Sequence, residues 1–135
     1  MIMKKIFLVL FVALALQSCS EKIGKEAVAN TSWVLTEWPG ETMPNTTKKA
    51  TLIFGEGDQI SGKSFCNGFG GTAKIEGNAI KFSELMGTMM FCEDVGQAEG
   101  KYTAGLKNTD SFKVVGGKLQ LLQNGKLLMV FSKAQ

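Results

Sequence analysis

The 135-residue chain contains no histidine and no arginine, and all 15 of its basic residues are lysines. Without histidine, the sequence lacks the usual general base at neutral pH and the commonest zinc ligand. Without arginine, it lacks the planar group that binds phosphate or carboxylate through two hydrogen bonds. Nucleophiles activated by histidine are therefore excluded. We expect a protein that is not an enzyme, with no catalytic residues, no metal and no cofactor.

The chain after residue 18 also lacks a large net charge of either sign. Two of the 15 lysines, Lys4 and Lys5, lie in the first 18 residues, so 13 lysines face 12 acidic residues in the remainder. Nucleic-acid binding depends on neutralising phosphates with a basic surface. We therefore expect no nucleic-acid partner.

The amino terminus has the pattern of an export signal. Lys4 and Lys5 precede eleven apolar residues, 6–16, which is too short a run for a membrane span of about 20 residues. The next residues complete Leu16-Gln17-Ser18-Cys19, which resembles the site cut by lipoprotein signal peptidase. We expect residues 1–18 to be a signal peptide, Cys19 to carry the lipid, and residues 19–30 to be a polar tether. Ser20 favours sorting to the outer membrane, so the predicted location is the bacterial cell envelope, with the membrane as a partner through the anchor.

Short apolar runs alternate with glycine-rich turns from Thr31 onward, which is typical of antiparallel strands. Around the turn Glu76-Gly77-Asn78, apolar residues alternate with Lys74 and Lys81, which predicts a hairpin. Gly116-Gly117 and Asn124-Gly125 predict the two turns of a later meander. The predicted strands are 32–38, 50–54, 59–64, 71–75, 79–82, 111–115, 118–123 and 127–132.

One segment has a helical spacing instead. Val95, Ala98, Tyr102 and Leu106 form an apolar stripe, and Asp94 is the expected N-cap. Several glycines weaken this helix by about 1 kcal/mol each, so we expect it to form by packing on the sheet. The predicted fold is α+β, with a curled, barrel-like antiparallel sheet of about eight short strands and one packed helix.

Two segments carry a family resemblance, ISGKSFCNGFGG from Ile60 and TMMFC from Thr88. They resemble the signature of the META domain, the family of heat-inducible HslJ-like envelope proteins. Phe65 departs from the signature, because the family usually has glycine before the cysteine. The resemblance covers most of a predicted domain at 31–135. The matching positions are Gly62, Cys66, Asn67, Gly71, Thr88, Met90, Cys92 and Glu99.

The resemblance implies a small α+β domain in the cell envelope, with a link to stress and no established enzymatic activity. The leading hypothesis is therefore a non-enzymatic lipoprotein that binds an envelope protein or stabilises an assembly. A carrier of a small apolar ligand is the alternative, because a curled sheet of this size can enclose one. A large unfilled cavity favours the carrier, and an exposed apolar patch favours the binder.

Cys66 and Cys92 are the only thiols left once Cys19 is acylated, and three interpretations are open. An even pair in an oxidising compartment favours a disulfide. Alternatively, both are buried free cysteines that act as small hydrophobes. A third interpretation groups them with Met86, Met89 and Met90 in a soft, sulfur-rich set of the kind that selects Cu(I).

Two polar features have both a structural and a functional interpretation. Glu99 is the acidic residue expected on the apolar side of the helix. Its functional interpretation is a polar group that faces a cavity, and its structural interpretation is a residue at the rim or a cap for nearby backbone amides. Asn67-Gly68 and Gly70-Gly71 can cradle an anion through backbone amides, but a bend between two strands is the favoured interpretation because no phosphate-loop helix follows.

Overall fold

The computed structural model describes residues 24–135, so the predicted signal peptide and lipidation site, Cys19, lie outside the described residues. The elements in chain order are the 3₁₀ helix η1 (Gly24–Ala27), β1 (Ser32–Glu37), β2 (Ala50–Phe54), β3 (Gln59–Ser64), β4 (Asn67–Glu76), β5 (Ala79–Gly87), α1 (Ala98–Asn108), β6 (Ser111–Val115), β7 (Lys118–Gln123) and β8 (Lys126–Lys133).

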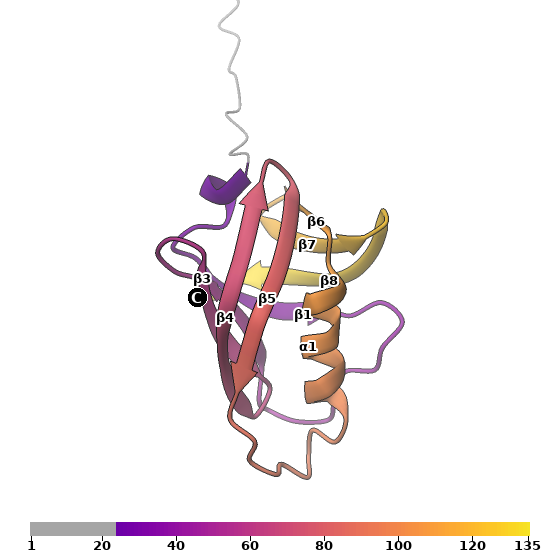
Figure 1. The fold of residues 1–135 in the computed structure, drawn as a ribbon. Helices are drawn as coiled ribbons and strands as arrows, with labels where there is room; N and C mark the ends of the chain where they lie inside the picture. Colours follow the sequence, from indigo (N-terminus) through magenta and orange to yellow (C-terminus); the bar gives the residue numbers. More distant parts are fainter. Residues whose placement is uncertain (1–23) are drawn as a thin grey trace, which may run out of the picture.

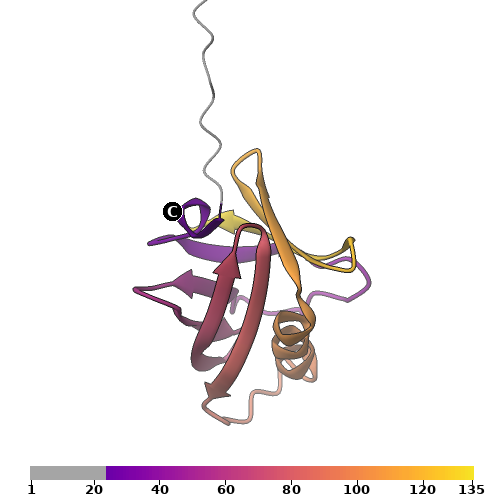
Figure 2. The same cartoon turned by 45° about the horizontal axis from the view of Figure 1, so that its top comes forward.

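The eight strands form a closed antiparallel barrel in which each strand pairs with its neighbours in sequence (Figure 1). The ring closes where β8 returns to β1, with Leu35 opposite Phe131. Helix α1 lies beside β5 (Figures 1 and 2) and packs against β3 and β5. The predicted α+β fold, a barrel-like sheet with one packed helix, is confirmed.

The strands follow the alternation of apolar residues, but β4 and β5 are longer than predicted. β2 buries Ala50, Leu52 and Phe54 and leaves the residues between them less buried. β4 begins at Asn67 rather than 71, because its first half is rich in glycine and offers no alternation of side chains.

Large side chains fill the interior of the barrel. The buried residues run from Val28 to Phe131, so residues 24–135 contain a hydrophobic core of their own. The largest fully buried side chains are Trp33, Tyr102, Phe131, Leu52, Leu106, Leu119, Leu121 and Met129. Val28 is fully buried and follows η1, so part of the segment predicted as a tether packs against the domain.

Helix α1 begins later than the apolar stripe predicts. Its N-cap is Gln97, which makes no side-chain capping bond, so the expected capping by Asp94 is wrong. Asp94 instead bonds to Lys48 Nζ at 2.8 Å and accepts a hydrogen bond from Thr46 Oγ1 at 2.6 Å. The Lys48 and Thr46 contacts lower the pKa of Asp94. Val95 is buried in a turn that precedes the helix. The spacing of the apolar stripe does not distinguish this turn from a helix.

The aromatic residue of α1 secures the helix to the barrel. Tyr102 is fully buried, and its hydroxyl donates a 2.8 Å hydrogen bond to the carbonyl oxygen of Thr51 in β2. Its ring lies about 6 Å from the rings of Phe65 and Phe69. This packing offsets the weak intrinsic helix propensity of a glycine-containing segment. None of the helices in residues 24–135 has the length and apolar character needed to cross a bilayer.

Candidate functional site

Glu99 joins helix α1 to the turn between β3 and β4. From the first turn of α1, its Oε1 atom accepts hydrogen bonds from the backbone N–H of Asn67 at 2.6 Å and of Cys66 at 3.1 Å. The same oxygen lies 3.3 Å from Ser64 Oγ, and Oε2 accepts a 2.7 Å bond from Asn67 Nδ2. A carboxylate that accepts four donors is acting as a cap for backbone amides. The structural interpretation of Glu99 is therefore confirmed.

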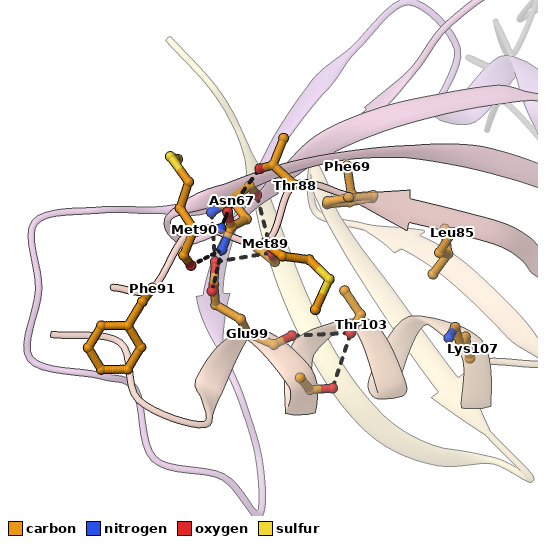
Figure 3. Close-up of a pocket in the computed structure, with 13 residues that line it drawn as sticks. Asn67, Phe69, Leu85, Thr88, Met89, Met90, Phe91, Glu99, Thr103 and Lys107 are labelled. Atoms are coloured by element: carbon orange, nitrogen blue, oxygen red, sulfur yellow. Dashed lines mark hydrogen bonds between the residues drawn. The ribbon is translucent and has the colours of Figure 1, made fainter. Parts of the chain in front are cut away.

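Asn67 extends this connection to the loop between β5 and α1. Its Oδ1 atom accepts bonds from Met90 N at 2.8 Å and Thr88 Oγ1 at 2.9 Å, while Nδ2 donates to Met90 O at 2.9 Å. With the Glu99 bond, all four hydrogen-bonding positions of the amide are used. Figure 3 shows these residues converging beside the first turn of the helix.

Cys66 and Cys92 are joined by a disulfide, with their Cα atoms 6.4 Å apart and a separation of 26 positions in sequence. The disulfide links the β3–β4 turn to the loop that leads into α1. The predicted bridge is thus present, and the two other interpretations of the cysteines are wrong. Because both cysteines are in the disulfide, neither offers a thiolate to Cu(I). Of the proposed sulfur ligands, only the thioethers of Met86, Met89 and Met90 remain. No three His, Cys, Asp or Glu side chains within residues 24–135 are grouped to hold a metal.

Two signature glycines occupy positions where a side chain does not fit. A Cβ atom on Gly62 would collide with the carbonyl oxygen of Thr51, and one on Gly71 would lie 2.7 Å from Leu85 Cδ2. The clash at Gly71 arises at a β-bulge, where β5 carries one extra residue opposite β4. These glycines therefore support the close packing of the barrel.

The bend between β3 and β4 lies at Phe65-Cys66, earlier than the predicted bend at Asn67-Gly68 and Gly70-Gly71. Phe65 has a φ of +71°, in the left-handed region that favours glycine. Glycine adopts this backbone conformation without strain. The phenylalanine is retained in an unfavourable backbone conformation by burial of its ring, which lies 5.9 Å from Trp38.

A cluster of large apolar side chains is exposed at the end of β5 and in the loop after it. We call Met86, Met89, Met90 and Phe91 the apolar loop. Met89 is 96% exposed and Phe91 is 92% exposed, while Met86 and Met90 are also mostly in solvent. The Asn67 bonds and the disulfide fasten the backbone on which these side chains stand. The apolar loop is therefore displayed on a fixed framework.

A groove of about 420 Å³ lies beside the apolar loop, between the ends of β4 and β5 and helix α1. Phe69 and Leu85 come from the strands, Thr103 and Lys107 come from the helix, and Met89 projects between them (Figure 3). Glu99 and Asn67 line the same groove. The groove is open to the surface.

The structure brings together most of the signature residues predicted as a site. Cys66, Asn67, Thr88, Met90, Cys92 and Glu99 form one network, whereas Gly62 and Gly71 act in the strands. Sequence reasoning missed the groove residues Phe69, Leu85, Thr103 and Lys107, which are distant in sequence. It also missed the exposure of Phe91, for which the only signal was an apolar run without helical or strand periodicity.

Comparisons with known proteins identify the family. A family model described as META domain matches residues 26–135. The chain belongs to the META domain family. The match begins before residue 31, in agreement with the burial of Val28 in this META domain. A search of curated proteins finds no match.

Three solved structures share the META domain's fold. An NMR structure of a protein from Burkholderia xenovorans is 25% identical, with a TM-score of 0.69 over 82% of this chain and 86% of that one. Another protein's NMR structure is 21% identical, with a TM-score of 0.63, 79% of this chain and 92% of that one covered. A crystal structure of a duf4847 family protein from Bacteroides vulgatus is 13% identical, with a TM-score of 0.61 and coverages of 80% and 95%.

Proposed function

We propose that this META domain protein is a non-enzymatic, lipid-anchored protein of the bacterial cell envelope that binds another protein and supports its assembly during stress. The observation that carries the proposal is the apolar loop, with Met89 and Phe91 almost completely exposed. Contiguous exposed apolar side chains are unfavourable in water and mark binding surfaces. Aromatic and methionine side chains are also enriched at the centres of protein interfaces.

The framework beneath the apolar loop supports a binding role. Met90 is held through both its N–H and its C=O by Asn67, and Cys92 is held by the disulfide. A loop that is already ordered loses less conformational entropy when a partner binds. The polar network and the disulfide thus favour affinity by holding the apolar loop in place.

The position of the apolar loop suits a partner that approaches from the side opposite η1. η1 packs near the β4–β5 turn, while the apolar loop lies at the other end of these strands (Figure 1). β4 has ten residues, and at the usual rise per residue such a strand spans about 30 Å. A lipid on Cys19 would therefore hold the amino-terminal end near a membrane and leave the apolar loop facing the periplasm.

The lipid anchor is tested at Cys19, because the thiol carries the lipid. We expect Cys19→Ser to move the protein from the membrane pellet to the soluble fraction or to leave it unprocessed. A processed Cys19→Ser protein that stays in the membrane would contradict the anchor. Separation of inner from outer membranes in the wild type tests the proposed outer-membrane location, which Ser20 favours.

The absence of enzymatic activity is part of the same proposal. Glu99, the acidic residue in the groove, accepts four donors, three at Oε1 and one at Oε2, and the chain has no histidine to work with it as acid or base. We expect no turnover of ester, peptide, phosphate or glycoside substrates. A reproducible activity that Glu99→Gln abolishes would contradict this expectation.

The binding role is tested by site-specific photo-crosslinking in cells. A photoreactive phenylalanine analogue replaces Phe91 in one variant and Val115, an exposed apolar residue of β6, in the control variant. We expect a discrete protein adduct at position 91 that increases under envelope stress, and none at position 115. An absence of adducts at positions 86, 89, 90 and 91 would contradict a protein-binding function.

A further inference from the structure

The sulfur atoms of residues 24–135 differ in their oxidation state. Cys66 and Cys92 are already oxidised to a disulfide, so this part of the chain holds no free thiol. Five of the seven methionines of the chain lie in the same residues. The thioethers are therefore the sulfur atoms of the domain that an oxidant can still attack.

Exposure to solvent separates the five methionines. Met89, Met86 and Met90, all in the apolar loop, are 96%, 78% and 60% exposed. Met43 is 37% exposed, and Met129 is fully buried in the core. Because the susceptibility of sulfur to oxidation increases with its exposure, the apolar loop is the part of the domain that an oxidant reaches first.

The exposed methionine side chains project from a fixed backbone. Figure 3 shows Met89 extending over the groove toward Thr103 of α1, and Met90 extending away from the helix. The backbone N–H and C=O of Met90 bond to Asn67, and neither bond involves a sulfur atom. Water would hydrate an oxygen atom added to an exposed sulfur in the free protein. Oxidation would thus change the surface of the apolar loop and leave the framework beneath it intact.

The chemistry of the change is the conversion of a thioether to a sulfoxide. Hypohalous acids and peroxides are the class of oxidant that supplies the oxygen atom. With hypochlorous acid, an S–O bond forms, the O–Cl bond breaks, the sulfur gives up two electrons, and chloride and a proton are released. The apolar side chain becomes polar. Burial of the new oxygen atom without a hydrogen-bond donor is unfavourable, so an interface that covers it loses affinity.

We propose that Met86, Met89 and Met90 form a methionine-oxidation site that controls binding of the partner protein. This inference rests on the proposed protein-binding function and names its regulation. In the reduced state, the thioethers present a flexible apolar surface that adapts to the partner. In the sulfoxide state, the same loop binds the partner about tenfold more weakly, because the polar oxygen atoms must be desolvated. An oxidant in the envelope would thus release the partner.

The first experiment identifies the methionines that are oxidised. Cells that produce the full-length protein are treated with hypochlorous acid and quenched with free methionine, and the purified protein is reduced and digested with trypsin. Cleavage after lysine separates the methionines: peptide 82–101 carries those of the apolar loop, 26–48 carries Met43 and 127–133 carries Met129. We expect tandem mass spectrometry to find Met89 oxidised at least about tenfold faster than Met129, with Met43 between them. Equal rates on the three peptides would overturn the site.

The second experiment measures binding, with the photoreactive phenylalanine analogue at position 91 as the reporter. The triple variant Met86→Leu/Met89→Leu/Met90→Leu keeps apolar side chains of similar volume that cannot accept oxygen, and Met43→Leu is the matched control. Treatment with hypochlorous acid before irradiation should lower the adduct yield about tenfold in wild type and in Met43→Leu. The yield of the triple variant should stay within about twofold of its untreated value. Met89→Leu alone should retain part of the yield, because the most exposed sulfur is absent.

Two results would overturn the control of binding and leave the proposed function standing. An equal loss of adduct in wild type and in the triple variant would show that the oxidant acts on the partner. An unchanged yield in wild type with peptide 82–101 fully oxidised would show that the sulfoxides do not weaken binding. By contrast, the absence of any adduct in untreated cells would contradict the protein-binding function itself, and the control of binding with it.

Discussion

Glu99 and Asn67, 32 residues apart in sequence, are joined twice: the carboxylate accepts the backbone N–H of Asn67 at 2.6 Å and its side-chain amide at 2.7 Å. One of these residues begins β4 and the other lies in the first turn of α1. The pair fastens the helix, the β3–β4 turn and the apolar loop to one another. Two signature residues thus act through one structural contact.

Removal of the Glu99 charge should destabilise the domain. Glu99→Gln replaces two acceptor oxygens by one and leaves donors near Asn67 without a partner, at a cost of roughly 1–3 kcal/mol. The free energy of unfolding, measured with urea, should fall by this amount. Glu93→Gln, at an exposed position in the same part of the chain, is the control and should stay within about 0.5 kcal/mol of wild type. Equal stability of Glu99→Gln and wild type would contradict the role of the pair.

Asn67→Asp should make stability depend on pH. A second carboxylate beside Glu99 would repel it and raise the pKa of one of the two groups in the folded state. A carboxyl group whose folded pKa is raised destabilises the fold above that pKa and loses the penalty as the pH falls through it. The variant should therefore lose less stability, relative to wild type, near about pH 5 than near about pH 7. Denaturant unfolding at both pH values measures this difference, and a constant difference would count against it.

Reduction of the Cys66–Cys92 disulfide should lower stability substantially. For a sequence separation of 26 between the cysteines, the chain-entropy model gives about 3.5 kcal/mol at room temperature. Mass spectrometry of alkylated, non-reduced protein should find neither thiol labelled. A reductant should lower the melting temperature of wild type but not of the Cys66→Ser/Cys92→Ser double variant. An equal effect on both proteins would show that the reductant acts elsewhere.

The left-handed backbone of Phe65 predicts an unusual order of stabilities. Both Phe65→Ala and Phe65→Gly lose the buried ring, at a cost of about 3–5 kcal/mol. Glycine adopts the observed φ of +71° without strain, whereas an L residue with a Cβ atom loses about 1 kcal/mol there. We expect Phe65→Gly to be more stable than Phe65→Ala in urea unfolding. The opposite order, which is normal in strands, would contradict the assigned backbone conformation.

Tyr102 provides a spectroscopic test of the core, because it is the only tyrosine in the chain. Burial raises the pKa of Tyr102 above its ordinary value of about 10. A group with a raised folded pKa stabilises the fold below the unfolded pKa, and this contribution is lost as the pH rises beyond it. Phenolate absorbance should therefore appear above about pH 10 only together with loss of near-UV circular dichroism. Phenolate formation in a protein with native circular dichroism would show that the hydroxyl is accessible.

A feature of the site could be predicted where composition or neighbouring residues indicate it, and could not be predicted where it depends on residues far apart in sequence. The Cys66–Cys92 pair was predictable because composition limits the partners of a thiol: once Cys19 is set aside, only two cysteines remain. The contact between Asn67 and Glu99 was only partly predictable, since an acidic residue on an apolar stripe indicates a buried partner without identifying it. Asp94 was misassigned as the N-cap because its long-range partner, Lys48, competes with the local role.

The elements and the class of fold could be predicted from the sequence, because period-two alternation, glycine turns and the stripe through Tyr102 are local patterns of burial. That Phe69, Leu85 and Lys107 line one groove follows from the tertiary structure alone. So does the exposure of Met89 and Phe91 to solvent. Apolar side chains are usually buried when the packing around them allows it. Here the Asn67 bonds and the disulfide hold the loop outward, and no local pattern contains those contacts.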